Sequence, residues 1–447
     1  MNAWSIVVVI VMLGILVTIH ELGHFWIACL LKIKAFEVSI FVGPRLIHWT
    51  RKGVDYSIRM IPLGAYVRFS EIDENGEVVA SDDPKLLINQ PRWKRLIVAI
   101  AGPFMNVVLG IMIFAVLFWV TGFTSLDIGT APEGSQLASQ EYTMGDTIVA
   151  VNDHRIYTYL DYYYATDNEV RRSDKLKLTL KSAETGKKYD VTLTPELKTR
   201  PMLGITTYKS TDNKYNGWEI LSVDENQNKG KPVLKVGDYL IKVDGKAVAD
   251  EDFQDFLDHL NEGDTMKLTF VRNGVTMEKE CIKTMITYAN DRGVRLIAYN
   301  VNSADRVFRA FGYAAKIPVS VIILSYKSIS DVFAGKEEVY NMVSGPVGVT
   351  TVVNDVVGDV DDDIGEKLYT LVMICGIISI GLTFTNLLPS PGLDGVQIIL
   401  IVVEMVIGRR LSKKAEGVIN VVGFFLLIAL VLFAFASDII RIFAEKA

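Results

Sequence analysis

Four long apolar runs alternate with segments of mixed polarity along the chain of 447 residues. They occupy residues 1–31, 96–120, 368–388 and 418–436. The last three runs contain no charged residue and, as helices, are long enough to cross a hydrocarbon layer of about 30 Å. The pattern therefore predicts four transmembrane helices.

Between the first two runs, in residues 32–95, the pattern changes to that of β-strands. Residues 36–47 and 56–69 mix β-branched with aromatic side chains, and glycines and prolines punctuate them. We expect a small β-hairpin or sheet that lies against, or dips into, the membrane face. Its edge could pair with an extended substrate, and a purely structural hairpin is the alternative. The candidates for substrate contact at this edge are Gly64, Tyr66 and Val67.

The long segment between the second and third runs contains two similar stretches. Residues 144–152 and 236–244 each begin with a Gly-Asp turn and continue as an alternating strand. Their separation indicates a tandem pair of domains, which we place at residues 122–200 and 201–290. Both stretches resemble PDZ domains, which are small α+β modules that bind extended peptides at a sheet edge. In the second copy a helix is expected over residues 252–260.

The segment 291–365 is apolar in part. Residues 307–326 could form an apolar helix but contain Arg309, Lys316 and Pro318. If this helix crossed the membrane, the third run would reverse its direction and its C-terminal end would face outside. We therefore interpret it as an amphipathic helix on the outer membrane surface.

Composition agrees with a division into membrane spans and water-soluble domains. Half of the residues are hydrophobic and 22% are charged, which is too apolar for an ordinary soluble protein and too charged for a purely embedded one. The net charge of −6 gives no sign of nucleic-acid binding. The three cysteines are far apart and indicate neither a disulfide framework nor a thiolate metal site.

Basic residues set the expected orientation in the membrane. They are concentrated in residues 32–95 and 409–414, and the positive-inside rule places both segments in the cytoplasm. Both termini and the water-soluble domains then lie outside. The predicted fold class is a polytopic α-helical membrane protein with four transmembrane helices, a membrane-associated β-hairpin or sheet and two extracytoplasmic α+β PDZ-like domains.

The first apolar run contains the main candidate chemistry, the sequence His-Glu-Leu-Gly-His at residues 20–24. On a helix, His20 and His24 share one face and could bind one Zn²⁺ through two imidazoles. Glu21 points beside that face, where it could take a proton from a zinc-bound water. Ionisable groups at membrane depth are costly and usually functional. The alternative is a helix whose histidines lie near the lipid headgroups and bind nothing.

The third run ends in a segment rich in proline and glycine, residues 386–395. Irregular backbone at membrane depth is tolerated only where protein or a wet cavity surrounds it. Asp394 could supply a third zinc ligand there and leave one position for water, as catalytic zinc requires. A helix end followed by a turn is the alternative, but it does not explain a carboxylate at the level of two histidines.

The second run contributes one more polar candidate, Asn106, which follows Gly102 and Pro103. Proline is tolerated near a helix start, and Gly102 would let another backbone approach. Asn106 could face the catalytic helix and hydrogen-bond to it. A role in helix packing is equally open.

Together these motifs resemble the site-2 protease family of intramembrane zinc proteases. The residues that carry the likeness are His20-Glu21-Leu22-Gly23-His24 and the pattern Asn386-x-x-Pro389-x-Pro391-x-Leu393-Asp394-Gly395. The tandem PDZ-like domains resemble the RseP branch, that of the regulator of sigma-E protease. The resemblance implies one Zn²⁺ per chain with His20, His24 and Asp394 as ligands and Glu21 as catalytic base. It also implies a substrate path lined by Asn386, Pro389 and Pro391, with Asn106 in a motif of the second span.

The same resemblance implies a metalloendopeptidase that cuts transmembrane segments of single-span membrane proteins during regulated intramembrane proteolysis in a stress response. The implied substrates are an anti-sigma factor already shortened by another protease and remnant signal peptides, and the PDZ pair would act as a size filter. The implied setting is the bacterial inner membrane, with a monomeric, multi-pass chain whose termini and PDZ domains are periplasmic and whose active site lies toward the cytoplasm.

Two functions without proteolysis remain open at this point. A membrane scaffold with a PDZ pair and a structural zinc would need a fourth protein ligand, but His48, His154 and His259 all lie outside the apolar runs. A metal or proton transporter would need inverted repeats or further polar residues in the spans. Neither feature is visible in the sequence.

Overall fold

The computed structural model contains helices and strands in two compact units, which are described separately. The first unit comprises residues 1–125 and 298–438, and the second is built from residues 126–297. The structure describes residues 3–70, 82–131, 133, 135–170, 175–193, 197–208, 217–223, 227–249, 265–272, 274–282, 284–289, 294–299, 306–333, 346–358, 363–388, 390, 392–410, 412, 417–419, 421–425, 428–429, 432–434 and 436–437.

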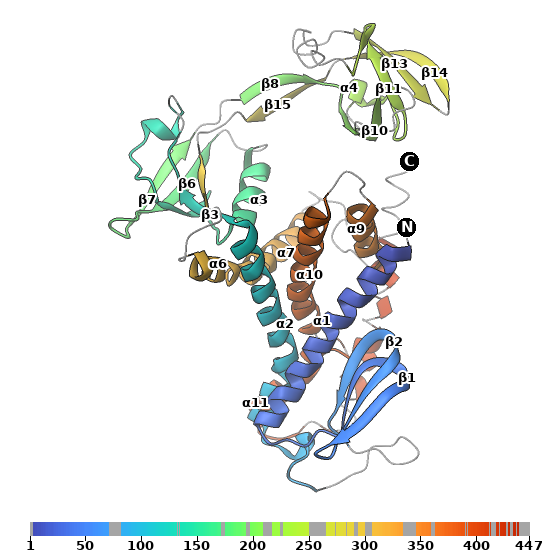
Figure 1. Cartoon of the computed structure of the whole chain (residues 1–447). Coiled ribbons are helices and arrows are strands. Elements are labelled where there is room, and N and C mark those ends of the chain that lie inside the picture. Colours follow the sequence, from blue (N-terminus) through green and yellow to red (C-terminus); the bar gives the residue numbers. More distant parts are fainter. Residues whose placement is uncertain are drawn as a thin grey trace. The chain divides into compact units, whose positions relative to one another are not determined.

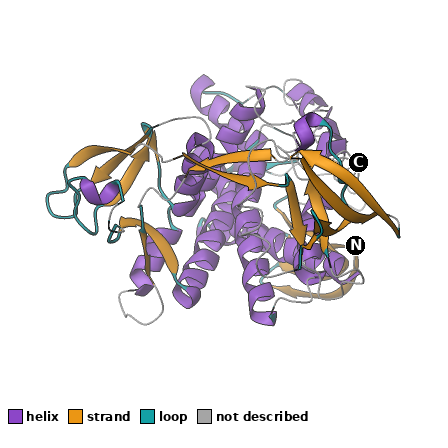
Figure 2. Cartoon of the chain, turned by 90° about the horizontal axis from the view of Figure 1, so that it is seen from above, coloured by secondary structure: helices purple, strands orange, loops and turns teal. Residues whose placement is uncertain are grey.

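The first unit is a helical bundle built around α2 (Figure 1). Its long helices are α1 (Ala3–Leu30), α2 (Arg92–Thr121) and α10 (Ile364–Asn386). Helix α2 packs against both α1 and α10, and the view from above shows helices gathered side by side (Figure 2). Small residues allow the close approach, since a Cβ on Gly23 would lie 2.6 Å from the carbonyl oxygen of Ala101. Three of the four apolar runs are thus confirmed as helices.

By length and composition, four described helical segments could cross a membrane. They are Trp4–Leu30, Arg92–Thr121, Val307–Ser328 and Ile364–Asn386. The third of these was expected to lie on the membrane surface. It consists of two helices, α6 (Arg306–Ala314) and α7 (Ile317–Phe333), and Figure 1 shows α6 lying across α2. Its surface location stays a prediction, and the run expected at 418–436 is described only in part.

The expected β-region forms two long, bent strands, β1 (Glu37–Arg51) and β2 (Val54–Arg68). The first four residues of β1 pair on one side with residues 55–58 and on the other with residues 65–68. The strand bends at Phe41 and Gly43, which both have positive φ angles. Residues 65–68 are consequently an edge of this sheet, and β2 packs against α1.

A short helix follows α10 in the first unit. This helix, α11 (Asp394–Ile407), is too short to cross a membrane. Gly395 lets it start against the end of α10, because a Cβ there would collide with the carbonyl oxygens of Leu387 and Leu388. Another short helix, α9 (Pro346–Gly358), packs against α1 through Val353.

The first of the two similar stretches lies in a sheet with the strand order β16-β3-β4-β6-β7. The short strand β5 pairs with β4, and α3 lies beside the sheet over a core of buried leucine, isoleucine and valine side chains. The elements are β3 (Phe123–Ile128), β4 (Thr147–Val151), β5 (His154–Arg155), α3 (Tyr159–Val170), β6 (Leu176–Lys181), β7 (Lys188–Leu193) and β16 (Leu296–Tyr299).

The second stretch lies in a sheet of the same kind, with the order β14-β13-β11-β10-β9. Strand β12 pairs with β11, and α4 precedes the Gly-Asp turn. The helix expected over 252–260 lies outside the described residues. The elements are β9 (Ile205–Tyr208), β10 (Trp218–Val223), α4 (Gln227–Gly230), β11 (Tyr239–Val243), β12 (Lys246–Ala247), β13 (Thr265–Arg272) and β14 (Val275–Ile282).

The two copies are nested rather than simply consecutive. Strand β8 (Leu197–Met202) leaves the first copy and pairs antiparallel with β15 (Thr284–Ala289), which returns from the second. Strand β16, expected within the membrane-surface segment 291–365, instead joins the sheet of the first copy. The expected boundary between the copies falls on β8. A repeat spacing alone cannot reveal such an insertion.

Candidate metal centre

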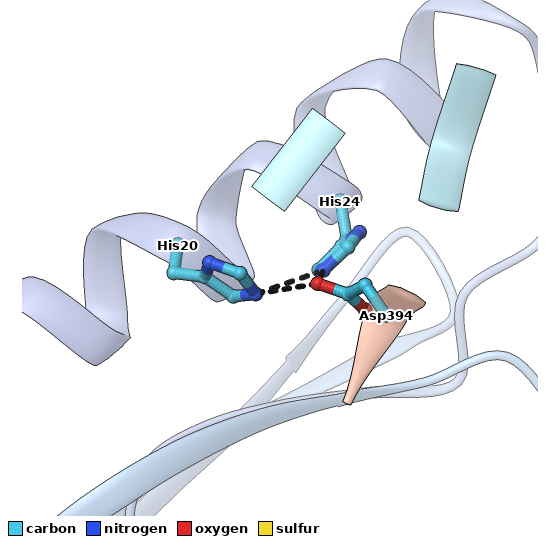
Figure 3. Close-up of side chains that lie close together, drawn as sticks. All are labelled: His20, His24 and Asp394. Atoms are coloured by element: carbon cyan, nitrogen blue, oxygen red, sulfur yellow. Dashed lines mark hydrogen bonds and ion pairs between the residues drawn. The ribbon is translucent and has the colours of Figure 1, made fainter. Parts of the chain in front are cut away.

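Three side chains from opposite ends of the chain meet inside the helical bundle (Figure 3). His20 and His24 lie one turn apart on α1, and Asp394 is the first residue of α11. The carboxylate Oδ2 of Asp394 lies 2.9 Å from Nε2 of His20 and 3.3 Å from Nε2 of His24. All three side chains are largely shielded from solvent. The three ligand atoms therefore face a common point.

The hydrogen bonds at this point are incomplete without a cation. Nδ1 of His24 donates to the carbonyl oxygen of Val98 at 2.7 Å, which leaves a lone pair on the Nε2 that faces Asp394. Oδ2 of Asp394 is buried and has no hydrogen bond of acceptable geometry within the described residues. Converging lone pairs on two imidazoles and one carboxylate are the donor set of catalytic zinc.

The backbone of α2 packs closely against both imidazoles. A Cβ on Gly102 would lie 2.6 Å from Nε2 of His20 and closer still to Nε2 of His24. Any side chain at position 102 would therefore collide with the imidazole nitrogens that face Asp394. The three donor atoms fit a metal ion held by His20, His24 and Asp394.

Glu21 lies beside this centre and connects it to the β-sheet. Its Oε2 accepts a hydrogen bond of 3.1 Å from the backbone N–H of Val67. The next residue, Arg68, directs its carbonyl toward the sheet, where it accepts from the N–H of Phe36. Because neighbouring residues of a strand alternate, the Val67 backbone faces away from the sheet and toward Glu21. The open edge of the sheet therefore faces the three candidate ligands.

An ion cluster holds the sheet near that edge. Glu37 is almost fully buried and pairs with Arg45, Arg59 and Arg68. Burial opposes the charge on Glu37, but hydrogen bonds from Arg59 and Tyr66 and the charge of Arg45 outweigh it, so the pKa of Glu37 lies below its ordinary value. The Tyr66 hydroxyl also accepts from Arg59. Tyr66 is thus tied into the sheet, so only its backbone is available at the edge.

Two asparagines lie beside His20, at its Nδ1 atom. The amide nitrogens of Asn106 and Asn386 are 3.3 Å and 3.4 Å from Nδ1 of His20. Asn106 is completely buried, and its Oδ1 has no partner within the described residues. The N and O atoms of an amide occupy nearly the same space, so the group fits equally well when turned over. With the amide of Asn106 turned over, Oδ1 would accept a proton from Nδ1 of His20.

The remaining expected site residues are two prolines and one glycine. Pro389 and Pro391 lie outside the described residues. Gly64 has a positive φ of 81° next to the edge segment. The sequence could not indicate that the Val98 carbonyl binds His24, because a backbone group leaves no residue signal.

Comparison with known proteins agrees with this arrangement. The sequence pattern described as Peptidase family M50 matches residues 8–430. A protein of Clostridium acetobutylicum, named as a candidate zinc metalloprotease, is 26% identical over 98% of each chain. The Regulator of sigma E protease of Haemophilus influenzae is 23% identical over 98% of this chain and 99% of that protein. A candidate zinc metalloprotease of Neisseria meningitidis is 26% identical over 96% of this chain and 97% of that protein.

The matched region runs from the first apolar helix, across the α1 histidines, past Asp394 at the start of α11. It covers most of the chain and includes every described candidate for metal ligand and proton transfer. With its long apolar helices, the chain is an integral membrane protein, and it belongs to Peptidase family M50.

Proposed function

We propose that this peptidase is a zinc-dependent intramembrane endopeptidase that cuts transmembrane segments of single-span membrane proteins. The observation that carries the proposal is the meeting of His20, His24 and Asp394, from opposite ends of the chain, at one buried point. Relatives that align over nearly the whole chain are named as zinc metalloproteases. Three protein ligands leave one position for water or substrate, as in catalytic rather than structural zinc.

Each side chain has one role in this proposal. His20, His24 and Asp394 hold the metal, with His24 oriented by the Val98 carbonyl. A zinc ion bound there would supply Lewis acidity, polarising the scissile carbonyl and making water acidic enough to attack near neutral pH. Glu21 takes the proton of the attacking water and passes it to the leaving amine. The bond from Val67 keeps the Glu21 carboxylate beside the ligands.

The sheet edge at residues 65–68 supports a specific mode of substrate binding. A transmembrane helix hides its carbonyls in internal hydrogen bonds, so a segment must unwind before it can be cut. An extended segment could then pair with the outward-facing backbone of Val67, next to Gly64 and Tyr66. Such a strand would compete with Glu21 for the Val67 N–H and release the carboxylate for proton transfer. Asn386, Pro389 and Pro391 would flank this path.

The similarity to a regulator of sigma E protease supports a finer proposal about substrates and setting. The substrates are an anti-sigma factor after a first cut and remnant signal peptides, in regulated intramembrane proteolysis. The nested PDZ-like pair would act as the size filter. We infer a monomeric protein of the bacterial inner membrane, with termini and PDZ-like domains in the periplasm and the metal centre toward the cytoplasm.

A carboxylate-to-amide substitution tests this mechanism. Glu21→Gln keeps the size of the side chain but removes the base, so cleavage of a membrane-embedded substrate should fall by about 10²–10⁴-fold. Zinc content should stay at one per chain, because Glu21 is not a ligand. Glu366→Gln, an exposed position at the start of α10, is the matched control and should cut at the parent rate.

The opposite result would favour a different function. If Glu21→Gln cut at the parent rate, the mechanism would be wrong. A zinc-loaded chain that bound peptides without cutting them would instead be a membrane scaffold with a PDZ-like pair.

A further inference from the structure

A basic cavity lies at the beginning of α2, away from the metal centre. It has a volume of about 500 Å³ and is lined by three arginines, Arg92, Arg95 and Arg410. Gln90, Trp93 and Met405 complete most of its wall. None of the lining residues in the described part of the chain is acidic. Its arginines come from both basic segments of the chain, which are more than 300 residues apart in the sequence.

The three arginines are held in place by bonds that use only part of their donors. Arg92 donates through Nη2 to the carbonyl oxygen of Gly408 at 2.6 Å, and Arg410 through Nη2 to that of Ile88 at 2.5 Å. Arg95 donates through Nη1 to the buried carboxylate of Glu404 at 2.8 Å. A guanidinium carries five N–H groups in a planar fork, so each arginine keeps donors for a further acceptor.

The cavity carries an excess of positive charge. Glu404 balances the charge of Arg95, whereas Arg92 and Arg410 have carbonyl oxygens as their described partners. In addition, Pro91 is the N-cap of α2 and gives no side-chain cap bond, so the amides of the first turn add a partial positive charge. Two full charges and a helix start therefore face the same space. This arrangement favours an acceptor with two or more charged oxygens, such as a phosphate.

The surroundings of the cavity point to a lipid rather than a soluble anion. Trp93 and Met405 in its wall are 49% and 45% exposed. The last turn of α11 continues this apolar surface with Val406 and Ile407, which are 82% and 50% exposed. Arginine and tryptophan next to exposed aliphatic side chains are typical of the membrane interface. A headgroup in the cavity would leave its acyl chains against this apolar surface.

We propose that the cavity is a binding site for an anionic phospholipid, whose phosphate is bound by Arg92, Arg95 and Arg410. Basic pockets between membrane helices bind anionic headgroups in this way. The phosphate would bridge the start of α2 and the end of α11. Because α11 begins at Asp394, the bound lipid would also stabilise the helix that carries this carboxylate.

Lipid retention by the full chain tests the proposal. The chain is purified into bilayer discs of phosphatidylcholine with a rising fraction of phosphatidylglycerol, and retained lipids are identified by native mass spectrometry. The parent should keep one phosphatidylglycerol in preference to phosphatidylcholine. An arginine near an anionic lipid contributes about fivefold in affinity, so Arg92→Gln/Arg410→Gln should weaken retention by about 30-fold.

A charge-matched variant separates this site from general attraction to the membrane. Arg51→Gln/Lys52→Gln removes two exposed charges from the turn between β1 and β2 and should keep the bound lipid. An equal loss in this control would overturn the proposal, as would no preference for phosphatidylglycerol in the parent chain. Displacement of the lipid by millimolar inorganic phosphate would identify a soluble anion as the ligand instead. The parent measurements decide the matter even if the arginine variant fails to fold.

Discussion

Two buried carboxylates on the same short helix, Asp394 and Glu404, have opposite surroundings. Both belong to α11, and both contact one of the two long helices α1 and α2. Glu404 is 2% exposed and has a protein cation, Arg95, at 2.8 Å. Asp394 is 15% exposed and faces two imidazoles, of which His24 presents a lone pair.

The difference distinguishes a structural carboxylate from the proposed metal ligand. A buried negative charge requires a nearby positive charge or several hydrogen bonds. The protein supplies that charge to Glu404 from its own sequence. It gives Asp394 two imidazoles, and these must be unprotonated to bind a metal, so in the metal-bound state the positive charge comes from the ion. The surroundings of a carboxylate, more than its burial, therefore indicate a metal ligand.

The largest effect is expected from removing the carboxylate that lacks a protein cation. Asp394→Ala should lower zinc affinity by more than the roughly 100-fold that outer-shell partners contribute, because a direct ligand is lost. Cleavage should fall below detection. Zinc analysis of the purified protein, with a cleavage assay, measures both effects. Glu404→Gln is the comparison and should still bind one zinc per chain. Loss of zinc in both variants would contradict the different roles of the two carboxylates.

The second prediction concerns Gly102, which packs against both imidazoles but is not itself a ligand. Gly102→Ala places a methyl group against Nε2 of His20 and of His24, so we expect a loss of zinc comparable to that of Asp394→Ala. Gly381→Ala, on α10, has open space around its Cβ and should keep zinc and activity. Parent-like zinc affinity in Gly102→Ala would show that the ion lies elsewhere.

The third prediction concerns the paired carboxylate. Arg95→Met leaves Glu404 buried without its cation, and such a change costs about 3–5 kcal/mol in the free energy of unfolding. Arg95→Met/Glu404→Leu removes both charges and should recover most of that loss. Thermal unfolding in one detergent compares the two variants. If the single variant were as stable as the parent, Glu404 would not depend on Arg95.

The metal centre also shows which features could be predicted from the sequence alone. His20 and His24 could be paired in advance because the helix repeat fixes their common face. Asp394 is 370 residues from His24, and no periodicity spans that distance. Its expected level in the membrane, at the irregular end of the third apolar run, and the family resemblance joined it to the histidines. The apolar runs at α1, α2 and α10 were likewise readable as helices from length and hydropathy.

Features that depend on backbone or on distant pairing could not be read from the sequence. The Val98 carbonyl that orients His24 has no side-chain signal. The insertion of the second copy into the first depends on β16 returning to β3, a pairing between distant segments. Glu404 did offer a signal, because an ionisable residue in an apolar helix requires a partner, but nothing in the sequence identified Arg95 as that partner.

The smallest effect is expected from the residue behind His20. If Asn106 accepts the Nδ1 proton of His20, it orients the imidazole for metal binding, and Asn106→Ala should weaken zinc affinity by about 10–100-fold. Asn106→Asp can accept the same proton and should retain most of the affinity. Competition with a chromophoric chelator measures zinc binding independently of cleavage.

A packing role for Asn106 predicts a different pattern. Ser379 on α10 donates to the backbone carbonyl of Asn106 at 2.8 Å, so Ser379→Ala disturbs the same helix contact without touching His20. If zinc affinity fell equally in Asn106→Ala, Asn106→Asp and Ser379→Ala, Asn106 would act through helix packing. A loss confined to Asn106→Ala would instead mean that the lone pair of an oxygen at this position orients His20, since alanine alone lacks one. Asp394 would then share the metal with an imidazole that is itself held by a buried amide, whereas Glu404 needs only its arginine.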